Sequence, residues 1–128
     1  FQALLAGGLI RRLPRLIAVQ AMPCAPLWAV HQYGGQGLGW VTEGATVAEG
    51  IRVVHPVRGD AVLAAVRETG GAVLAVEEDA ILPARAALAR LGLYAEPTGA
   101  VVWAALEQAP AAGPLVAILT GHGLKSAA

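Results

Sequence analysis

The candidate chemistry of this chain gathers near its C-terminal end, in the stretch LTGHGLK (119–125). This stretch holds the hydroxyl of Thr120, the imidazole of His122 and the amine of Lys125, which is the only lysine of the sequence. An amine can act as a nucleophile, while a hydroxyl or an imidazole can hydrogen-bond a ligand or carry a proton. The preceding run, PLVAILT (114–120), is apolar and predicts a buried strand. Because ligands of open α/β sheets lie beyond the carboxyl ends of strands, we expect the Thr120 hydroxyl to face a crevice there.

Other candidate side chains lack partners at a useful spacing. His31 and His55 have no neighbours at metal-ligand or catalytic-triad spacing, so we expect surface or packing roles for them. No two carboxylates stand at a spacing that requires acid–base chemistry. The glycine-rich segment YGGQGLGWVTEGA (33–45) does not join a clear strand to a helix, so we expect a flexible loop rather than a phosphate cradle. The single cysteine, Cys24, is expected to be a small buried apolar residue.

The elements that must position these groups alternate between helices and strands. Helical spacing and helix start and stop signals predict helices at 2–12, 25–32, 61–71, 80–92 and 97–109, with Asp60 and Asp79 as caps of the third and fourth. Short apolar runs predict strands at 15–21, 72–76 and 114–120. Alternation of this kind predicts an α/β fold, a partial three-layer parallel sheet of about three strands with helical crossovers.

Composition limits the classes of protein to consider. A chain of 128 residues is long enough for one domain. Nine basic residues balance nine acidic ones, with no cluster denser than Arg11, Arg12 and Arg15, so we expect no nucleic-acid partner. The apolar runs end well before the roughly 20 residues of a membrane-spanning helix, so we expect no membrane partner. The lone Cys24 predicts a cytoplasmic setting.

Charged residues are scarce, which bears on partners. They make up 14% of the chain, below the roughly 25% of an ordinary soluble domain. We therefore expect a surface that is covered by a partner, or self-association through apolar side chains. The sequence also begins at Phe1 without a methionine, which we interpret as a cut rather than a natural start.

Four segments in a fixed order resemble the C-terminal part of threonine synthase, a fold type II pyridoxal-phosphate enzyme. They are LPRLIAVQAMPCAPL (13–27), TVAEGIRVVHPVRGDAVLAAVRETGGAVLAV (46–76), YAEPTGAVVWAAL (94–106) and LTGHGLK (119–125). Related dehydratases also carry an acidic-Gly-Ile segment and a Glu-Pro-x-x-Ala segment, whereas the TGHGLK ending is similar to threonine synthase. The resemblance therefore implies pyridoxal phosphate as the cofactor.

The resemblance assigns cofactor-binding roles to the terminal segment. It implies that the Thr120 hydroxyl is the partner of the cofactor's pyridine nitrogen. A neutral hydroxyl does not hold a proton on that nitrogen, so the ring would be a more moderate electron sink. Gly121 and Gly123 would let the backbone pass close to the flat ring.

Further candidates follow from the other segments. Glu49 and Gly50 resemble the acidic-Gly element near the edge of the cofactor, although a glutamate at a turn can also be simply solvated. Glu96 would lie near the ring or cap the helix that begins at Pro97. For His122 the motif implies a loop-shaping role rather than proton transfer.

The resemblance also indicates what lies outside this chain. In the family, the Schiff-base lysine and the glycine loop that binds the cofactor phosphate come earlier in the sequence, so no catalytic residue is assigned here. Lys125 is accordingly interpreted as a structural cation or one at the mouth of the site. Residues 1–128 would form the C-terminal part of the cofactor-binding large domain, and the isolated fragment is expected to be inactive because covalent catalysis needs its amine.

These implications lead to a functional hypothesis with two rivals. The parent enzyme would convert O-phosphohomoserine and water into threonine and phosphate, with an amino acid as its small-molecule substrate and the remainder of the enzyme as this chain's partner. One alternative is a fragment of a pyridoxal-phosphate-dependent serine or threonine dehydratase. The other is a non-catalytic remnant or interaction module.

Overall fold

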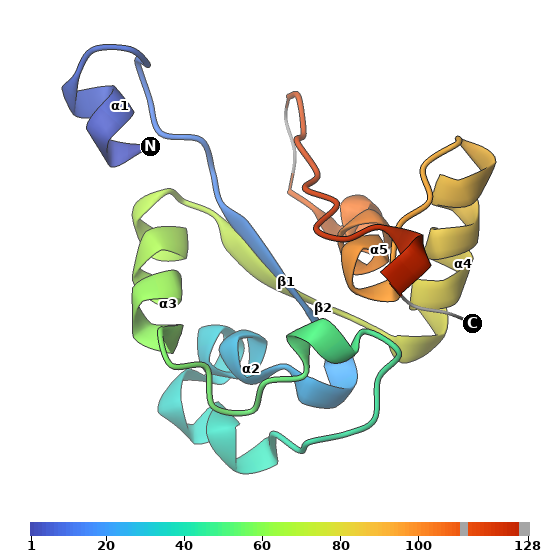
Figure 1. Cartoon of the computed structure of the whole chain (residues 1–128). Coiled ribbons are helices and arrows are strands. Elements are labelled where there is room, and N and C mark those ends of the chain that lie inside the picture. Colours follow the sequence, from blue (N-terminus) through green and yellow to red (C-terminus); the bar gives the residue numbers. More distant parts are fainter. Residues whose placement is uncertain (111–112, 126–128) are drawn as a thin grey trace.

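The computed structural model describes residues 1–110 and 113–125. Short 3₁₀ turns join its helices and strands, and three of these turns matter below: η2 (Gly34–Trp40), η3 (Glu49–Ile51) and η5 (Gly123–Lys125). The regular elements shown in Figure 1 are α1 (Gln2–Ala6), β1 (Ile17–Ala21), α2 (Pro26–Tyr33), α3 (Gly59–Glu68), β2 (Ala72–Val76), α4 (Glu78–Arg90) and α5 (Pro97–Ala104).

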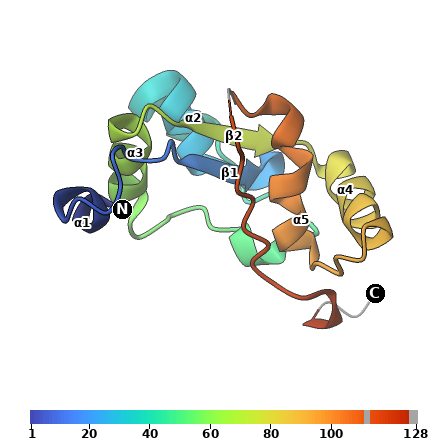
Figure 2. The same ribbon diagram turned by 90° about the horizontal axis from the view of Figure 1, so that it is seen from above.

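Two parallel strands form the middle layer of the fold. β1 pairs with β2 in a register that runs from Ile17 opposite Ala72 to Ala21 opposite Val76. Side chains of a strand alternate between the two faces of the sheet. On one face Val73 packs with residues of α2 and α3, and on the other Val76 packs with residues of α4 and α5. Figures 1 and 2 show these helix pairs on opposite sides of the strands, which confirms the predicted layered α/β fold.

The predicted third strand is wrong. Residues 114–120 are extended, but they join no sheet, and the sheet of the described residues has only β1 and β2. Val116 and Ile118 are 88% and 70% exposed, whereas Leu119 is half-buried against α5. An apolar run satisfies the side-chain pattern of a covered strand, but a strand also needs a neighbour for its backbone. Within the described residues this segment has none.

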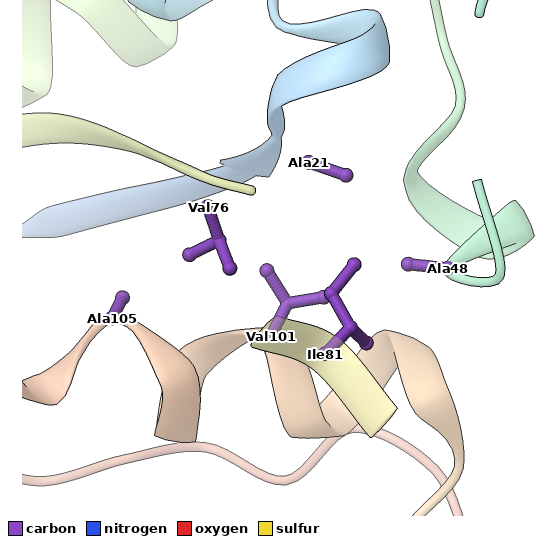
Figure 3. Close-up of a cluster of buried hydrophobic side chains, with 6 residues drawn as sticks. All are labelled: Ala21, Ala48, Val76, Ile81, Val101 and Ala105. Atoms are coloured by element: carbon purple, nitrogen blue, oxygen red, sulfur yellow. The ribbon is translucent and has the colours of Figure 1, made fainter. Parts of the chain in front are cut away.

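A buried cluster at the carboxyl ends of the strands holds the sheet to α4 and α5. Ile81 of α4 and Val101 of α5 meet Val76 at the end of β2, and all three are at most 1% exposed (Figure 3). Ala21, Ala48 and Ala105 complete the cluster. Full burial of one such branched side chain stabilises the fold by about 1.5–3 kcal/mol. The end of the sheet, the loop around Ala48 and α5 are therefore fixed relative to one another.

Helix boundaries differ slightly from those expected. Asp60 and Asp79 lie in the first turns of α3 and α4 rather than at their caps, which are Arg58 and Glu77. A carboxylate in the first turn still interacts favourably with the partial positive charge of a helix N-terminus. The first helix, α1, ends at Ala6 instead of reaching residue 12, and it has no buried residue.

Two other expectations can be compared with the structure. The glycine-rich segment is not a flexible loop throughout, because η2 packs on α2 so closely that a Cβ on Gly37 would overlap the backbone of Ala29. Cys24 is buried as expected, and this burial raises the pKa of its thiol. None of the described helices has the length and apolar character needed to cross a membrane.

A buried amide supports the start of α2 and provides a test of the fold. Gln20, 7% exposed on β1, accepts a hydrogen bond from the Trp28 N–H through its Oε1 at 3.0 Å. Because the first-turn N–H groups of a helix lack partners within the helix, Gln20→Ala should lower the free energy of unfolding by about 1–2 kcal/mol. Urea unfolding measures this change. Gln32→Ala, at an exposed position of α2, is the control and should change it little; equal effects of the two substitutions would contradict the role of Gln20.

Candidate functional site

The predicted site segments meet at the N-terminal end of α5. Glu96 occupies the N-cap position of this helix, and Pro97 is its first residue. A Cβ on Gly50 would lie 3.0 Å from Oγ1 of Thr98, which places the acidic-Gly segment against the first turn. A Cβ on Gly99 would lie 3.4 Å from the Thr120 nitrogen, which places the terminal segment against the same turn. Three segments that are distant in sequence thus converge at one helix end.

The terminal segment is held there by main-chain pairing. The Glu96 N–H donates to the Gly121 carbonyl at 3.0 Å, and the Gly123 N–H donates to the Tyr94 carbonyl at 2.8 Å. Between these bonds, Ala95 and His122 form an isolated antiparallel bridge. Both views show the terminal segment running beside α5 (Figures 1 and 2). This pairing sets the position of Thr120, the residue that precedes it.

The acidic-Gly segment is held by a side chain of α4. Oε1 of Glu78 accepts a hydrogen bond from the Val47 N–H at 2.6 Å, and the Thr46 hydroxyl accepts one from the Ala48 N–H at 3.1 Å. Ala48 is fully buried in the cluster of Figure 3. Oε2 of Glu78 is buried and has no partner among the described residues. These contacts bring η3, which starts at Glu49, to α5.

Thr120 is exposed, and no described residue hydrogen-bonds its hydroxyl. The hydroxyl is therefore available to a ligand, although Thr120 does not end a strand as expected. Glu49 is exposed as well, so the solvated-turn interpretation and the site interpretation both remain open for it. Glu96 makes no side-chain cap hydrogen bond, which argues against the capping role of its carboxylate.

Gly121 and Gly123 lie against protein side chains, whereas we expected them to lie against the cofactor ring. A Cβ on Gly121 would overlap the Glu96 carboxylate, and a Cβ on Gly123 would lie 2.8 Å from the Tyr94 ring. Within the described residues the missing side chains thus make room for protein groups. Approach of these two glycines to a cofactor ring stays a prediction.

The remaining candidates lie in other surroundings or shape loops. His31 is in α2 and His55 is exposed in the loop before α3, both outside the cluster of segments around α5. Nδ1 of His122 accepts a hydrogen bond from the Leu124 N–H at 3.2 Å, a loop-shaping contact of the predicted kind. Lys125 is exposed in the terminal turn. Residues 1–110 and 113–125 contain no group of three or more side chains arranged to hold a metal ion.

Sequence reasoning did not single out Thr98, Gly99, Tyr94 or Arg85. Gly99 carried a usable signal, because a glycine inside an otherwise apolar helix is unfavourable and often marks a close approach of backbone. Tyr94 and Arg85 gave no such signal. Their contacts join α4 to the loop after it, and neither residue belongs to a recognisable pattern.

The family profile of pyridoxal-phosphate dependent enzymes matches residues 2–121 of this chain. The chain belongs to this family. The family's cofactor, pyridoxal phosphate, is the one that the resemblance of the four segments implied.

Curated relatives within the family include several threonine synthases. That of Methanosarcina acetivorans is 34% identical over 125 residues, covering 92% of this chain and 31% of the relative. That of Synechocystis sp. is 36% identical over 119 residues, covering 89% of this chain and 29% of the relative. The enzyme of Mycobacterium leprae is 33% identical over 127 residues, covering 94% and 33%. The chain therefore spans about a third of the length of these relatives.

A solved structure supports the fold. The crystal structure of a threonine deaminase from T.th. superposes with a TM-score of 0.56 at 22% sequence identity, covering 83% of this chain and 37% of that chain. At this identity the likeness concerns the fold alone.

The described residues fit part of a pyridoxal-phosphate site. The free hydroxyl of Thr120 can hydrogen-bond a ring nitrogen, and the N-terminus of α5 lies beside it with its partial positive charge. The Thr98 and Gly99 N–H groups of that turn have no partner among the described residues. The only amine side chain of these segments is that of the exposed Lys125, so the covalent attachment is not explained by this cluster.

The contact between Gly121 and Glu96 can be tested by substitution. Gly121→Ala places a methyl group where the Glu96 carboxylate lies. Because this carboxylate is the far end of a flexible, half-buried side chain and can rotate away, we expect the free energy of unfolding to fall by about 1 kcal/mol at most. Urea unfolding measures the loss. Gly39→Ala, where a Cβ meets nothing within 4 Å, is the control.

A double-mutant cycle separates this contact from a general effect of the methyl group. In a Glu96→Ala background the clash is absent, so Gly121→Ala should cost much less there. An equal cost in both backgrounds would show that the two residues do not interact.

Proposed function

We propose that residues 1–128 are the C-terminal part of the cofactor-binding large domain of a threonine synthase-like enzyme. The observation that carries this proposal is the convergence of the Gly50, Glu96 and Thr120 segments at the N-terminal end of α5, where no described residue hydrogen-bonds the Thr120 hydroxyl. The similarity to threonine synthases over about nine-tenths of the chain supports the choice within the family. The complete enzyme would form threonine and phosphate from O-phosphohomoserine and water.

Each site residue has a defined part in this proposal. When bound, pyridoxal phosphate supplies an electron-withdrawing ring that stabilises negative charge on the substrate carbon. The Thr120 hydroxyl would hydrogen-bond the ring nitrogen and would leave it without a fixed proton. Glu96, Glu49 and Gly50 would lie near the edge of the ring, and Gly121 and Gly123 would let the backbone pass close to it.

The chemistry requires parts beyond this chain. The exposed Lys125 is the only lysine, and it lies in the terminal turn rather than beside Thr120 in a protected site. A catalytic amine is activated by removal from water or by a neighbouring cation, whereas Lys125 is exposed to solvent. The chain alone is therefore proposed to be inactive, with a cytoplasmic setting inferred from its lone, buried Cys24.

Substitution of Thr120 tests the proposed role in the longer enzyme that contains this chain. Thr120→Val keeps the shape of the side chain and removes the hydroxyl. Because the proposed hydrogen bond to the ring nitrogen of the cofactor is lost, the rate of threonine formation should fall by about 10- to 100-fold. Release of phosphate from O-phosphohomoserine measures the rate. Thr120→Ser retains the hydroxyl and is the matched control.

Two outcomes would redirect the proposal. Rapid conversion of serine or threonine to a keto acid, without use of O-phosphohomoserine, would identify the dehydratase alternative. Absence of cofactor binding by any form of the longer polypeptide would favour the non-catalytic remnant.

The exposed apolar side chains of 114–120 are proposed to contact the remainder of the enzyme. Leu115, Val116 and Ile118 are 46%, 88% and 70% exposed, and the threonine synthase relatives are about three times as long as this chain. In the absence of that remainder, the same side chains would drive self-association.

Sedimentation of the isolated chain tests the use of this surface. We expect species larger than the 13.0 kDa monomer, and a shift toward the monomer when Val116 and Ile118 are replaced by lysine. Val57→Lys, at another fully exposed valine, is the control and should leave the distribution unchanged. A compact monomer at high concentration of the unmodified chain would contradict the expectation.

A further inference from the structure

The guanidinium of Arg85 is held by the loop that follows its own helix. Arg85 lies half-buried within α4, and its Nε donates a hydrogen bond to the Ala95 carbonyl at 3.1 Å. One terminal nitrogen lies 3.5 Å from the Tyr94 hydroxyl, and the guanidinium carbon is 5.5 Å from the centre of the Tyr94 ring. None of the carboxylates in the described part of the chain forms an ion pair with Arg85. Within the described residues, the polar and cation–π contacts of the guanidinium are thus made with Tyr94 and Ala95.

The same short stretch pairs with the terminal segment on its other edge. The carbonyl of Tyr94 accepts from Gly123, and the N–H of Glu96 donates to Gly121. Backbone groups of consecutive residues in an extended chain point to opposite edges. The Ala95 carbonyl therefore faces away from the terminal segment, toward α4, where Arg85 meets it.

The Tyr94 ring adds a second link between Arg85 and the terminal segment. It stacks edge-to-face with the His122 ring at a centroid distance of 5.5 Å, and it covers the Cα of Gly123. The guanidinium lies on the ring as a cation–π contact, a geometry that the planar fork of arginine suits better than the ammonium of lysine. Arg85 thus acts on both the backbone and the ring that hold residues 121–123.

Loss of Arg85 would leave a buried polar group without a partner. Ala95 is only 3% exposed, and its carbonyl has Arg85 as its side-chain partner. A largely buried acceptor that loses its donor destabilises the local structure. The stretch from Tyr94 to Glu96 would then loosen, and the paired terminal segment with it.

We propose that Arg85 is a positioning residue, which fixes Tyr94 and Ala95 and through them sets the place of the Thr120 hydroxyl beside α5. Among the described residues, Arg85 makes no hydrogen bond or ion pair with a candidate cofactor-binding residue. Its effect on threonine formation rests on the proposed function, whereas its effect on the backbone pairing of 94–96 with 121–123 does not.

Amide hydrogen exchange in the whole polypeptide that carries this chain tests the structural part. Arg85→Ala should make the Gly123 and Glu96 amides exchange about 10-fold faster, which corresponds to about 1.4 kcal/mol of local opening free energy. The amides between β1 and β2 should keep their rates. Arg90→Ala, which removes an exposed arginine from the last turn of α4, is the matched control and should change neither set.

Conservative variants keep the test decisive if Arg85→Ala fails to fold. Arg85→Lys keeps the charge and the stem but loses the planar fork, so Gly123 and Glu96 should still exchange about 3-fold faster. Tyr94→Phe keeps the ring and should behave as the unmodified protein. Unchanged exchange of Gly123 and Glu96 in Arg85→Lys, or equal rates in the Arg85→Ala and Arg90→Ala variants, would overturn the inference.

Kinetics of the longer enzyme then separate this inference from the proposed function. If both hold, Arg85→Ala should lower the rate of threonine formation in the same direction as Thr120→Val, and Arg85→Lys should recover part of it. Faster exchange at Gly123 in Arg85→Ala, together with no effect of Thr120→Val on any activity, would support the positioning role and refute the proposed function.

Discussion

The main-chain pairing of Tyr94, Ala95 and Glu96 with Gly121, His122 and Gly123 is the constraint on which the candidate site depends. It holds a terminal segment that belongs to no sheet against the first turn of α5. The approach is so close that the Glu96 carboxylate and the Tyr94 ring occupy the space where side chains at 121 and 123 would lie. Loss of this pairing would move Thr120, whatever ligand its hydroxyl meets.

Helix α4 carries the supports of the two loops that meet at α5. Glu78 in its first turn accepts from Val47, and Arg85, seven positions later, donates to Ala95. Residues seven apart lie on nearly the same side of a helix, so one surface of α4 serves both loops. Between them Ile81 anchors the helix in the cluster with Val76 and Val101 (Figure 3). Apolar burial thus fixes the helix, and its polar side chains fix the site.

The sequence correctly predicted the elements whose residues restrict the backbone locally. It failed for the segment whose structure depends on contact with a residue or strand distant in the sequence. Proline and glycine positions placed the starts of α2 and α5 and the ends of α3 and α4 to within a few residues, because these residues restrict the backbone directly. The end of α5, predicted at residue 109, lies at Ala104. The two paired strands were predicted from short apolar runs. The run at 114–120 has the same composition but no partner strand, and composition cannot supply one. Likewise the motifs identified Glu96 and Gly121 separately, while their mutual contact depends on the fold.

The terminal segment and the two-stranded sheet both leave backbone hydrogen-bonding groups without partners among the described residues. A two-stranded sheet leaves an outer edge on each strand, and the extended backbone of residues 115–120 has unused donors and acceptors within the described residues. Exposed branched side chains such as Val116 and Ile118 favour an extended backbone, but they gain stability only when covered. The threonine synthase relatives are about three times as long as this chain, so each has further residues that match no part of it. Leu119, packed on α5, is the apolar anchor of this segment within the described residues, and contact of its exposed side chains with the remainder of the enzyme is the part that we propose.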